Sequence, residues 1–381
     1  FSINYEGDIT LGIRPDKIDI VDQNSPNNGS VKVFSNESTG ESNLITCKME
    51  DQSLIIKADK NTNYDIDNEI FLNFNKKIKL IIFGNKNLIS NNFLEKYSQM
   101  ISFVHCEETI ADNDVPSSVL RSKKNSSMRK AIEYIKSKKN IGFVSAGNTG
   151  AVTALSTILL GTLKNIKRPA FCSMIPTSKG FCIMLDLGAN KESNENQLLQ
   201  FSIMGHAFAK TKNISNPKVA ILNIGTEEGK GKEYLQEAYN LINNSFLSND
   251  FIGYIEPDQI TMGKADVIVT DGFTGNIALK TAEGLSNFIM NNFKKVFTKN
   301  LLNNIAYLIL RKDLVRFSNT VNPIKYNGAI VLGLNSVVVK SHGSASPEAF
   351  AQALDNCSEF VKKDINKLII EELKLVNFVN D

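Results

Sequence analysis

The stretch Ile141-Gly142-Phe143-Val144-Ser145-Ala146-Gly147-Asn148-Thr149-Gly150 decides the fold of this chain. Its first half is short and mostly apolar, which predicts a buried strand that ends at Ser145. Small and polar residues follow, and the apolar face of residues 149–163 predicts a helix that begins at once. A strand that leads directly into a helix is the repeating unit of parallel sheets with covering helices.

The same alternation continues on both sides of this stretch. The predicted strands are residues 79–84, 182–186, 218–223, 265–271 and 337–339, and the predicted helices include residues 126–137 and 197–210. This rhythm predicts an α/β fold, with a mainly parallel sheet and flanking helices. Ligands of such sheets lie beyond the carboxyl ends of the strands. Those ends carry Ser145, Asp186, Asn223 and Asp271.

Residues 1–77 have a different character. Short apolar stretches alternate there with turn-rich segments such as Asn27-Asn28-Gly29, at near-regular spacing. This pattern predicts a small antiparallel barrel. We therefore expect two domains, a small all-β barrel at residues 1–77 and an α/β domain at residues 78–381.

Composition sets outer limits on the function. A net charge of +3 over 381 residues gives no general attraction to nucleic acid. The five cysteines show no C-x-x-C spacing, which argues against a zinc site or a disulfide framework and indicates a reducing cytosol. No apolar run is long enough to cross a bilayer. The chain starts at Phe1 without a leader sequence, so we read it as a fragment or a processed product.

The loop from Ser145 to Gly150 has two interpretations. Small residues let backbone N–H groups approach an anion, and a helix N-terminus favours negative charge, so the loop could bind phosphate or an oxyanion. The same residues also suit a tight turn in which Asn148 or Thr149 caps the helix. Two further strand ends, at residues 186–190 and 271–276, combine an acid, a glycine and an amide. Three such turns on one rim of a sheet favour a shared pocket.

Other motifs supply candidate charges and acids. The segment Gly225 to Lys232 imitates a phosphate-binding P-loop, but its glycine spacing is one residue short and no Ser or Thr follows Lys230. Lys230 and Lys232 could still neutralise phosphate. His342 follows an apolar strand, where it could act as an acid or donate to an oxyanion. The three histidines lack metal-ligand spacing, which argues against a metal site. We expect no cofactor.

Residues 294–317 form a basic stretch with one apolar face. Such a helix can lie on an anionic membrane surface, or it can pack on a core or on a second copy of the chain. We favour the membrane. The expected membrane contacts are Phe297, Leu301, Leu308 and Ile309.

With these residues in view, the chain from about residue 78 to residue 372 resembles the phosphate acyltransferase (PlsX) family. The matching segments are RSKKNSSMR at 121–129, VSAGNTGA at 144–151, RPA at 168–170, LDLGAN at 185–190, QFSIMG at 200–205, LNIGTEEGKG at 222–231, ADVIVTDGFTGN at 265–276 and KSHGS at 340–344. The resemblance implies a fold like that of isocitrate and isopropylmalate dehydrogenases, a homodimer, and association with the membrane surface. It implies transfer of a fatty acyl group from acyl carrier protein to inorganic phosphate for phospholipid synthesis.

The resemblance fixes positions more firmly than roles. We predict catalytic roles for His342, Asn148 and Lys230. The predicted substrate-binding residues are Ser145, Gly147, Thr149, Asp186, Asn190, Lys232, Asp271 and Asn276. One departure is that the family opens with a strand and an Asp-Ala-Met-Gly-Gly-Asp loop, and residues 1–77 hold no counterpart of that loop.

Residues 1–77 instead resemble the TOBE domain that ends sugar-type ABC transporter ATPases. The carrying segments are LGIRPD at 11–16, GSVKV at 29–33, ESTGE at 37–41 and IFLNF at 70–74. Two alternatives therefore stay open. One is a related enzyme of the same fold, a phosphotransacetylase or a metal- and NAD-dependent dehydrogenase, although only Asp266 and Asp271 approach an acidic metal cluster. The other is a non-catalytic module that binds a transporter or a membrane.

Overall fold

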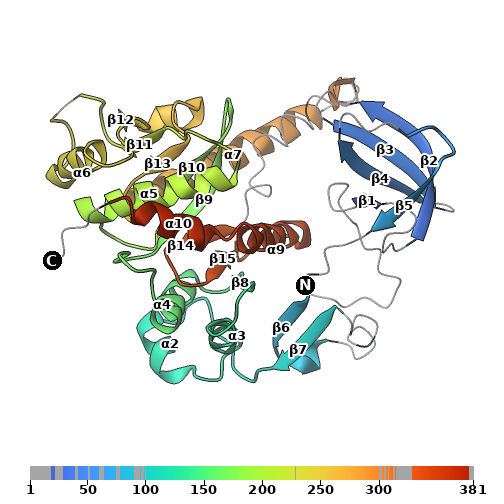
Figure 1. The fold of residues 1–381 in the computed structure, drawn as a ribbon, viewed down its shortest axis with the longest axis horizontal. Helices are drawn as coiled ribbons and strands as arrows, with labels where there is room; N and C mark the ends of the chain where they lie inside the picture. Colours follow the sequence, from blue (N-terminus) through green and yellow to red (C-terminus); the bar gives the residue numbers. More distant parts are fainter. Residues whose placement is uncertain are drawn as a thin grey trace. The chain divides into compact units, whose positions relative to one another are not determined.

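The computed structural model (Figure 1) describes residues 19–21, 29–38, 42–49, 52–59, 64–73, 78–89, 95, 98, 100–227, 229–299, 303, 306, 307, 309–311, 314 and 328–376. The chain divides into two compact units, residues 1–82 with 87–103, and residues 83–86 with 104–381.

The first unit contains an antiparallel sheet of five strands. These are β1 (Asp19–Val21), β2 (Gly29–Ser38), β3 (Ser42–Met49), β4 (Gln52–Asp59) and β5 (Glu69–Asn73), in the order β1-β5-β2-β3-β4. Alternate residues of these strands, such as Val31 and Val33, point into a small core with Ile45 and Ile56. Closure of the strands into a barrel stays a prediction. Residues 11–16, 39–41 and 74, which carry part of the TOBE resemblance, lie outside the described residues.

Two further strands, β6 (Leu80–Gly84) and β7 (Ile101–His105), form a separate two-stranded sheet. The boundary between the two units runs through both strands. The position of β6 agrees with the strand predicted at residues 79–84. A short 3₁₀ helix, η2 (Lys86–Leu88), follows it.

The second unit is built on an eight-stranded sheet in the order β12-β11-β13-β10-β9-β14-β15-β8. Its strands are β8 (Gly142–Ser145), β9 (Ala170–Thr177), β10 (Gly180–Leu185), β11 (Val219–Leu222), β12 (Phe251–Ile255), β13 (Val267–Val269), β14 (Ala329–Leu332) and β15 (Val337–Lys340). Four of its seven pairings are parallel, and the antiparallel ones all involve β9 or β14. The predicted α/β fold with a mainly parallel sheet is confirmed.

Helices cover both faces of this sheet. They are α2 (Pro116–Ser122), α3 (Ser127–Ile135), α4 (Thr149–Leu160), α5 (Glu195–Thr211), α6 (Glu233–Asn243), α7 (Gly272–Phe297), α9 (Pro347–Lys362) and α10 (Ile365–Leu373), with the 3₁₀ helix η3 (Pro257–Met262). In Figure 1, α5, α9 and α10 lie side by side over the sheet. Among the described residues, no helix has both the length and the apolar composition that crossing a bilayer requires.

The strands show why both faces are covered. In β10, Ile183 and Leu185 pack into the core beneath α5, whereas Cys182 and Met184 pack into the core on the side of α3 and α4. Successive strand residues point to opposite faces, so a strand that is apolar at every position must be buried on both. The pairings set the direction of each strand: β10, β11 and β13 run parallel to one another, whereas β8 and β15 run the opposite way. The loop after Ser145 therefore leaves the sheet in the opposite direction from the loops after β10 and β13, and the prediction that all three turns lie on one rim is wrong.

Candidate active site

The loop between β8 and α4 is held from two sides. Lys340, the last residue of β15, pairs in register with Ser145, and the Ser341 N–H donates a 2.9 Å hydrogen bond to the Ser145 carbonyl. The Gly147 N–H donates to Ser145 Oγ at 3.1 Å. The loop therefore follows a path that the neighbouring strand determines, and Gly147 and Thr149 lie at its exposed turn.

Asn148 uses its whole side chain for structure. Its Oδ1 accepts a hydrogen bond from the Ala151 N–H at 3.0 Å, which caps α4. Its Nδ2 reaches the carbonyls of Ala111, Asp112 and Asp114 at 3.3, 2.8 and 3.1 Å. Asn148 thus joins the start of α4 to the loop before α2. The catalytic role predicted for Asn148 stays a prediction, and this geometry favours an indirect contribution.

The Asp186 carboxylate holds the backbone of the second loop, residues 186–190, which follows β10. This buried carboxylate accepts hydrogen bonds from the N–H groups of Phe171, Gly188, Ala189 and Asn190, at 2.8 to 3.1 Å. Asn190 Nδ2 adds a fifth at 2.9 Å and also donates to the Pro169 carbonyl. Burial raises the pKa of Asp186, although these donors oppose the shift. Because its acceptor positions are occupied, Asp186 shapes the loop that presents Gly188 to Asn190.

The third loop begins α7 and lies directly against the second. A Cβ atom at Gly272 would lie 2.1 Å from the Asn190 carbonyl oxygen, and one at Gly275 would lie 1.9 Å from that of Asp186. Only glycine permits this approach. Asp271 receives hydrogen bonds from the N–H and the hydroxyl of Thr274 and from the Tyr234 hydroxyl. Asn276 packs beside Gly188, since a Cβ atom there would lie 3.5 Å from the Asn276 Cβ.

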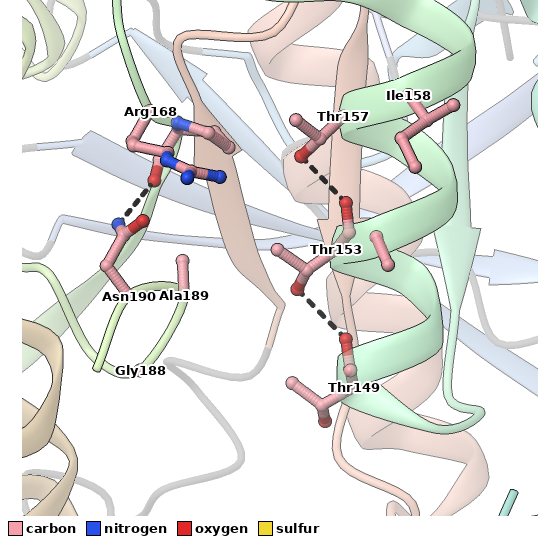
Figure 2. Close-up of a pocket in the computed structure, with 11 residues that line it drawn as sticks. Thr149, Thr153, Thr157, Ile158, Arg168, Gly188, Ala189 and Asn190 are labelled. Carbon is pink, nitrogen blue, oxygen red and sulfur yellow. Dashed lines mark hydrogen bonds between the residues drawn. The ribbon is translucent and has the colours of Figure 1, made fainter. Parts of the chain in front are cut away.

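A groove of about 340 Å³ lies between α4 and the second loop, and Figure 2 shows the residues that line it. Thr149, Thr153 and Thr157 form one face of α4 toward it, because residues four apart lie on the same side of a helix. Arg168 and the segment 188–190 form the opposite wall. We call this space the threonine groove. Two of the three predicted loops therefore meet across one cavity, and the third supports it.

A second cavity of about 400 Å³, which we call the loop cavity, opens around the start of α4. Its lining consists of Asp112, Ala146, Gly147, Asn148, Thr149, Gly150, Lys340 and Gly343. The N–H groups of Thr149 and Gly150, at the first turn of α4, donate no hydrogen bond within the described part of the chain. They are available to an anion. Thr149 and Gly150 line both cavities.

Lys340 is a lining residue that the sequence analysis did not select by itself. Its Nζ donates to the carbonyls of Ala146, at 3.3 Å, and Ser341. Burial lowers the pKa of Lys340 to about 8, while Asp112 raises it and Lys280 lowers it further. The available signal was its place at the end of an apolar strand, on the same rim as Ser145.

Other predicted residues lie elsewhere in the described structure. Neither Lys230 nor Lys232 lines either cavity, and Lys230 is exposed with its Nζ 2.7 Å from Glu227. That contact raises the pKa of Lys230 and lowers that of Glu227. His342 is exposed, and its Nδ1 lies 2.9 Å from the Ser344 hydroxyl, although its neighbour Gly343 lines the loop cavity.

The predicted membrane contacts are only partly described. Phe297 ends α7, and its ring centroid lies 5.9 Å from that of Tyr307. Ile309 is exposed at 76%. Leu301 and Leu308 lie outside the described residues.

Comparisons with known proteins identify the family. Residues 69–368 match the family model described as "Fatty acid synthesis protein". The phosphate acyltransferase of Ehrlichia chaffeensis is 48% identical over 289 residues, which cover 74% of this chain and 85% of that protein. The phosphate acyltransferase of Brevibacillus brevis is 37% identical over 302 residues, or 79% and 90% of the two chains. Among solved structures, EutD phosphotransacetylase from Staphylococcus aureus has a TM-score of 0.47 at 16% identity, covering 73% of this chain and 84% of that one. The chain therefore belongs to the fatty acid synthesis protein family and is a relative of the phosphate acyltransferases.

Proposed function

We propose that this chain transfers a fatty acyl group from the thioester of acyl carrier protein to inorganic phosphate, giving an acyl phosphate for phospholipid synthesis. Membership of the family and relatives named phosphate acyltransferase support the reaction class. The observation that carries the proposal is the loop cavity, where two unbonded N–H groups and the Lys340 side chain lie at one opening. Donors of this kind are what a phosphate anion requires.

The threonine groove supports the placement of the second substrate. It meets the loop cavity at Thr149 and Gly150, so a thioester in the groove lies next to phosphate in the cavity. The groove offers hydroxyl oxygens on α4 and the exposed Arg168, which suit the amide-rich arm that carries acyl groups on carrier proteins. Holding both reactants at one junction lowers the entropic part of the barrier.

The proposed step is a nucleophilic substitution at the carbonyl carbon. A phosphate oxygen attacks the thioester carbonyl, a carbon–oxygen bond forms, and the carbonyl oxygen becomes an oxyanion. The carbon–sulfur bond then breaks, and the departing thiolate takes up a proton. Because the first N–H groups of α4 hold the attacking phosphate in this proposal, the oxyanion needs a separate donor, for which His342 is the candidate. We assign proton donation to His342, and additional charge or positioning to Lys230, Lys232, Asn190 and Asn276.

The proposal also covers how this protein assembles and where it lies in the cell. The second half of α7 exposes Phe288, Phe293 and Val296, and exposed apolar side chains that cluster mark interaction surfaces. We propose that α7 pairs with a second copy of the chain. Ile309 is exposed together with the basic Lys299 and Arg311, which supports contact with an anionic membrane surface. We place the protein in the cytoplasm, bound peripherally to the membrane, with acyl carrier protein as its partner.

The test is direct measurement of the product. The full chain is incubated with palmitoyl-acyl carrier protein and inorganic phosphate, and acyl phosphate is trapped with hydroxylamine as the hydroxamate. We expect hydroxamate that depends on phosphate. A parallel reaction with acetyl-coenzyme A separates a short-chain phosphotransacetylase from the proposed enzyme. Thioester consumption without a phosphate-dependent hydroxamate would overturn the proposal.

A further inference from the structure

We propose that the ammonium group of Lys340 is the cation that binds inorganic phosphate in the loop cavity. This inference rests on the proposed function and deepens it, because it names the residue that selects the acyl acceptor. Lys340 acts as a binding and positioning residue and forms no covalent intermediate.

Lys340 lies beside the loop between β8 and α4. Lys340 ends β15, which pairs in parallel with β8. Its register partner is Ser145, where the loop between β8 and α4 begins. The side chain lines the same cavity as the unbonded N–H groups of Thr149 and Gly150. Its Nζ contacts the carbonyls of Ala146 and Ser341. Both carbonyls are neutral acceptors that an arriving phosphate oxygen can replace.

No carboxylate of the described residues lies within ion-pair distance of the Lys340 Nζ. Other lysines of this unit have such a partner: Lys210 with Glu372, Lys212 with Glu359, Lys230 with Glu227, and Lys280 with Glu283. A half-buried ammonium without a counter-ion is destabilised by its loss of hydration. An anion in the cavity would offset that loss.

Two other charged side chains act on the Lys340 ammonium group. Asp112 reaches the cavity from the loop before α2, and Lys280 acts on Lys340 from α7. Burial is the main reason that the pKa of Lys340 falls to about 8, so the side chain is mostly charged at neutral pH. A phosphate dianion next to the ammonium favours the charged form still further. Lysine binds phosphate as a point charge, and it does so in other phosphate sites.

A cation at this position should affect which nucleophile accepts the acyl group. Phosphate and water compete as nucleophiles for the thioester. The ammonium attracts the phosphate anion, whereas neutral water gains little from it. Removing the charge should therefore reduce acyl-phosphate formation more than thioester hydrolysis.

The experiment compares Lys340→Met, Lys340→Arg and the wild type. A control variant, Lys367→Met, removes an exposed lysine on α10. Initial rates at pH 7 give kcat and the KM for phosphate, and calorimetric titration with inorganic phosphate gives Kd without turnover. We expect Lys340→Met to raise the phosphate KM and Kd roughly tenfold or more, with the KM for the acyl donor nearly unchanged. Lys340→Arg should recover most of the phosphate affinity, and Lys367→Met should match the wild type.

The outcomes separate this inference from the proposed function. An active Lys340→Met with a phosphate KM and Kd within about twofold of the wild type would overturn the inference and leave the function intact. A wild type that makes no acyl phosphate, yet binds phosphate through Lys340, would overturn the function and support the inference. If Lys340→Met fails to fold, as judged by circular dichroism, Lys340→Arg decides. A folded Lys340→Arg that keeps its affinity for phosphate supports the inference. A folded Lys340→Arg that loses this affinity contradicts the inference.

Discussion

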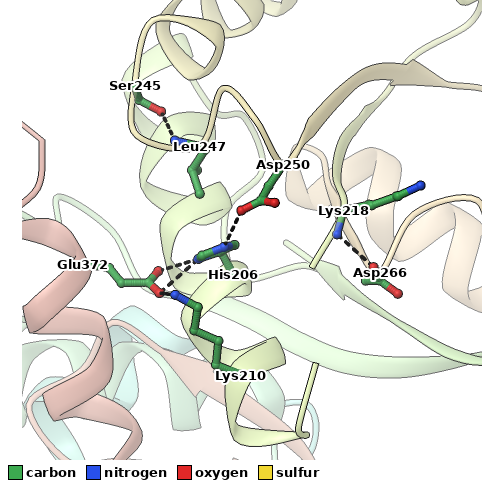
Figure 3. Close-up of polar contacts among 8 residues, drawn as sticks. All are labelled: His206, Lys210, Lys218, Ser245, Leu247, Asp250, Asp266 and Glu372. Carbon is green, nitrogen blue, oxygen red and sulfur yellow. Dashed lines mark hydrogen bonds and ion pairs between the residues drawn. The ribbon is translucent and has the colours of Figure 1, made fainter. Parts of the chain in front are cut away.

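The imidazole of His206 on α5 lies 2.9 Å from the carboxylate of Glu372 on α10, and this contact joins residues 166 positions apart (Figure 3). Both side chains are buried. The other ring nitrogen of His206 lies 3.3 Å from Asp250, and Lys210 Nζ lies 2.9 Å from Glu372. The last helix among the described residues, α10, is thereby fixed to α5 on the same face of the sheet.

Glu372→Ala should destabilise the second unit by about 3 kcal/mol, because it leaves His206 buried without one of its partners. Urea unfolding measured by circular dichroism checks the size of the effect. The neighbouring Glu371→Ala is a matched control. Glu371 is exposed, and its carboxylate makes only a long contact of 4.0 Å with the Lys367 Nζ. Its loss should therefore change the free energy of unfolding by less than about 0.5 kcal/mol. Equal effects of the two variants would show that the buried contact contributes nothing particular.

Gly275→Ala should disrupt the packing of α7 on the loop from Asp186 to Asn190. The added Cβ would lie 1.9 Å from the Asp186 carbonyl oxygen, which is backbone and cannot rotate away. We expect a lower melting temperature together with loss of acyl-phosphate formation. Gly284→Ala, on the same helix, places its Cβ in open space and should stabilise the protein by about 0.5 to 1 kcal/mol. A fully active Gly275→Ala would show that the loops need not touch.

Asn148 has two separable tasks, and two variants distinguish them. Asn148→Ala loses the cap of α4 and should cost about 1 kcal/mol of stability. Asn148→Asp keeps an acceptor for the Ala151 N–H but loses the donor to the carbonyls at residues 111, 112 and 114. It also adds negative charge beside the phosphate site. We expect Asn148→Asp to keep the cap of α4, to loosen the loop at residues 111–114, and to raise the phosphate KM more than Asn148→Ala does, as steady-state kinetics would show.

Much of the second unit could be predicted from the sequence, because several of its strands are almost entirely apolar and end on or before polar residues. The strands at 142–145, 180–185, 219–222 and 267–269 fall within two residues of their predicted bounds. The antiparallel strand β9 was not predicted. Its sequence, AFCSMIPT, contains a proline and polar residues, and its strand character depends on pairing with β10 and β14.

The site was less predictable than the fold, because a motif gives residue types without their hydrogen-bond partners. Asn148 was predicted to be catalytic and Asp186 and Asp271 to bind substrate, and these roles stay predictions. The structure shows that all three side chains hold the backbone of the loops in place. Lys340 was overlooked because nothing in its sequence neighbourhood shows that a half-buried lysine lacks a carboxylate partner. Only the register of β15 against β8 brings it to the loop at Ser145.

Ile309→Glu should weaken binding to anionic vesicles if the proposed membrane contact is correct. The substitution replaces an exposed apolar side chain with a negative charge in a basic region. Co-sedimentation with vesicles containing phosphatidylglycerol measures the bound fraction. Leu375→Glu changes a similarly exposed apolar residue beyond α10 and is the control. We expect Ile309→Glu alone to lose binding, and equal losses in both variants would point to a general charge effect.

The affinity for phosphate should fall as the pH rises through about 8, because burial brings the pKa of Lys340 to that value. Below this pH the side chain is charged and binds phosphate, and above it the side chain is neutral. The pH dependence of kcat/KM for phosphate reports the free enzyme. Lys280→Gln removes a cation that lowers the pKa of Lys340, so it should move the alkaline limb to higher pH. Asp112→Asn removes an anion that raises it and should move the limb to lower pH. Phosphate ionises identically in every assay, so opposite shifts in these two variants, and no limb near pH 8 in Lys340→Arg, would identify Lys340 as the titrating group. A limb at one pH in all four proteins would assign it to another group.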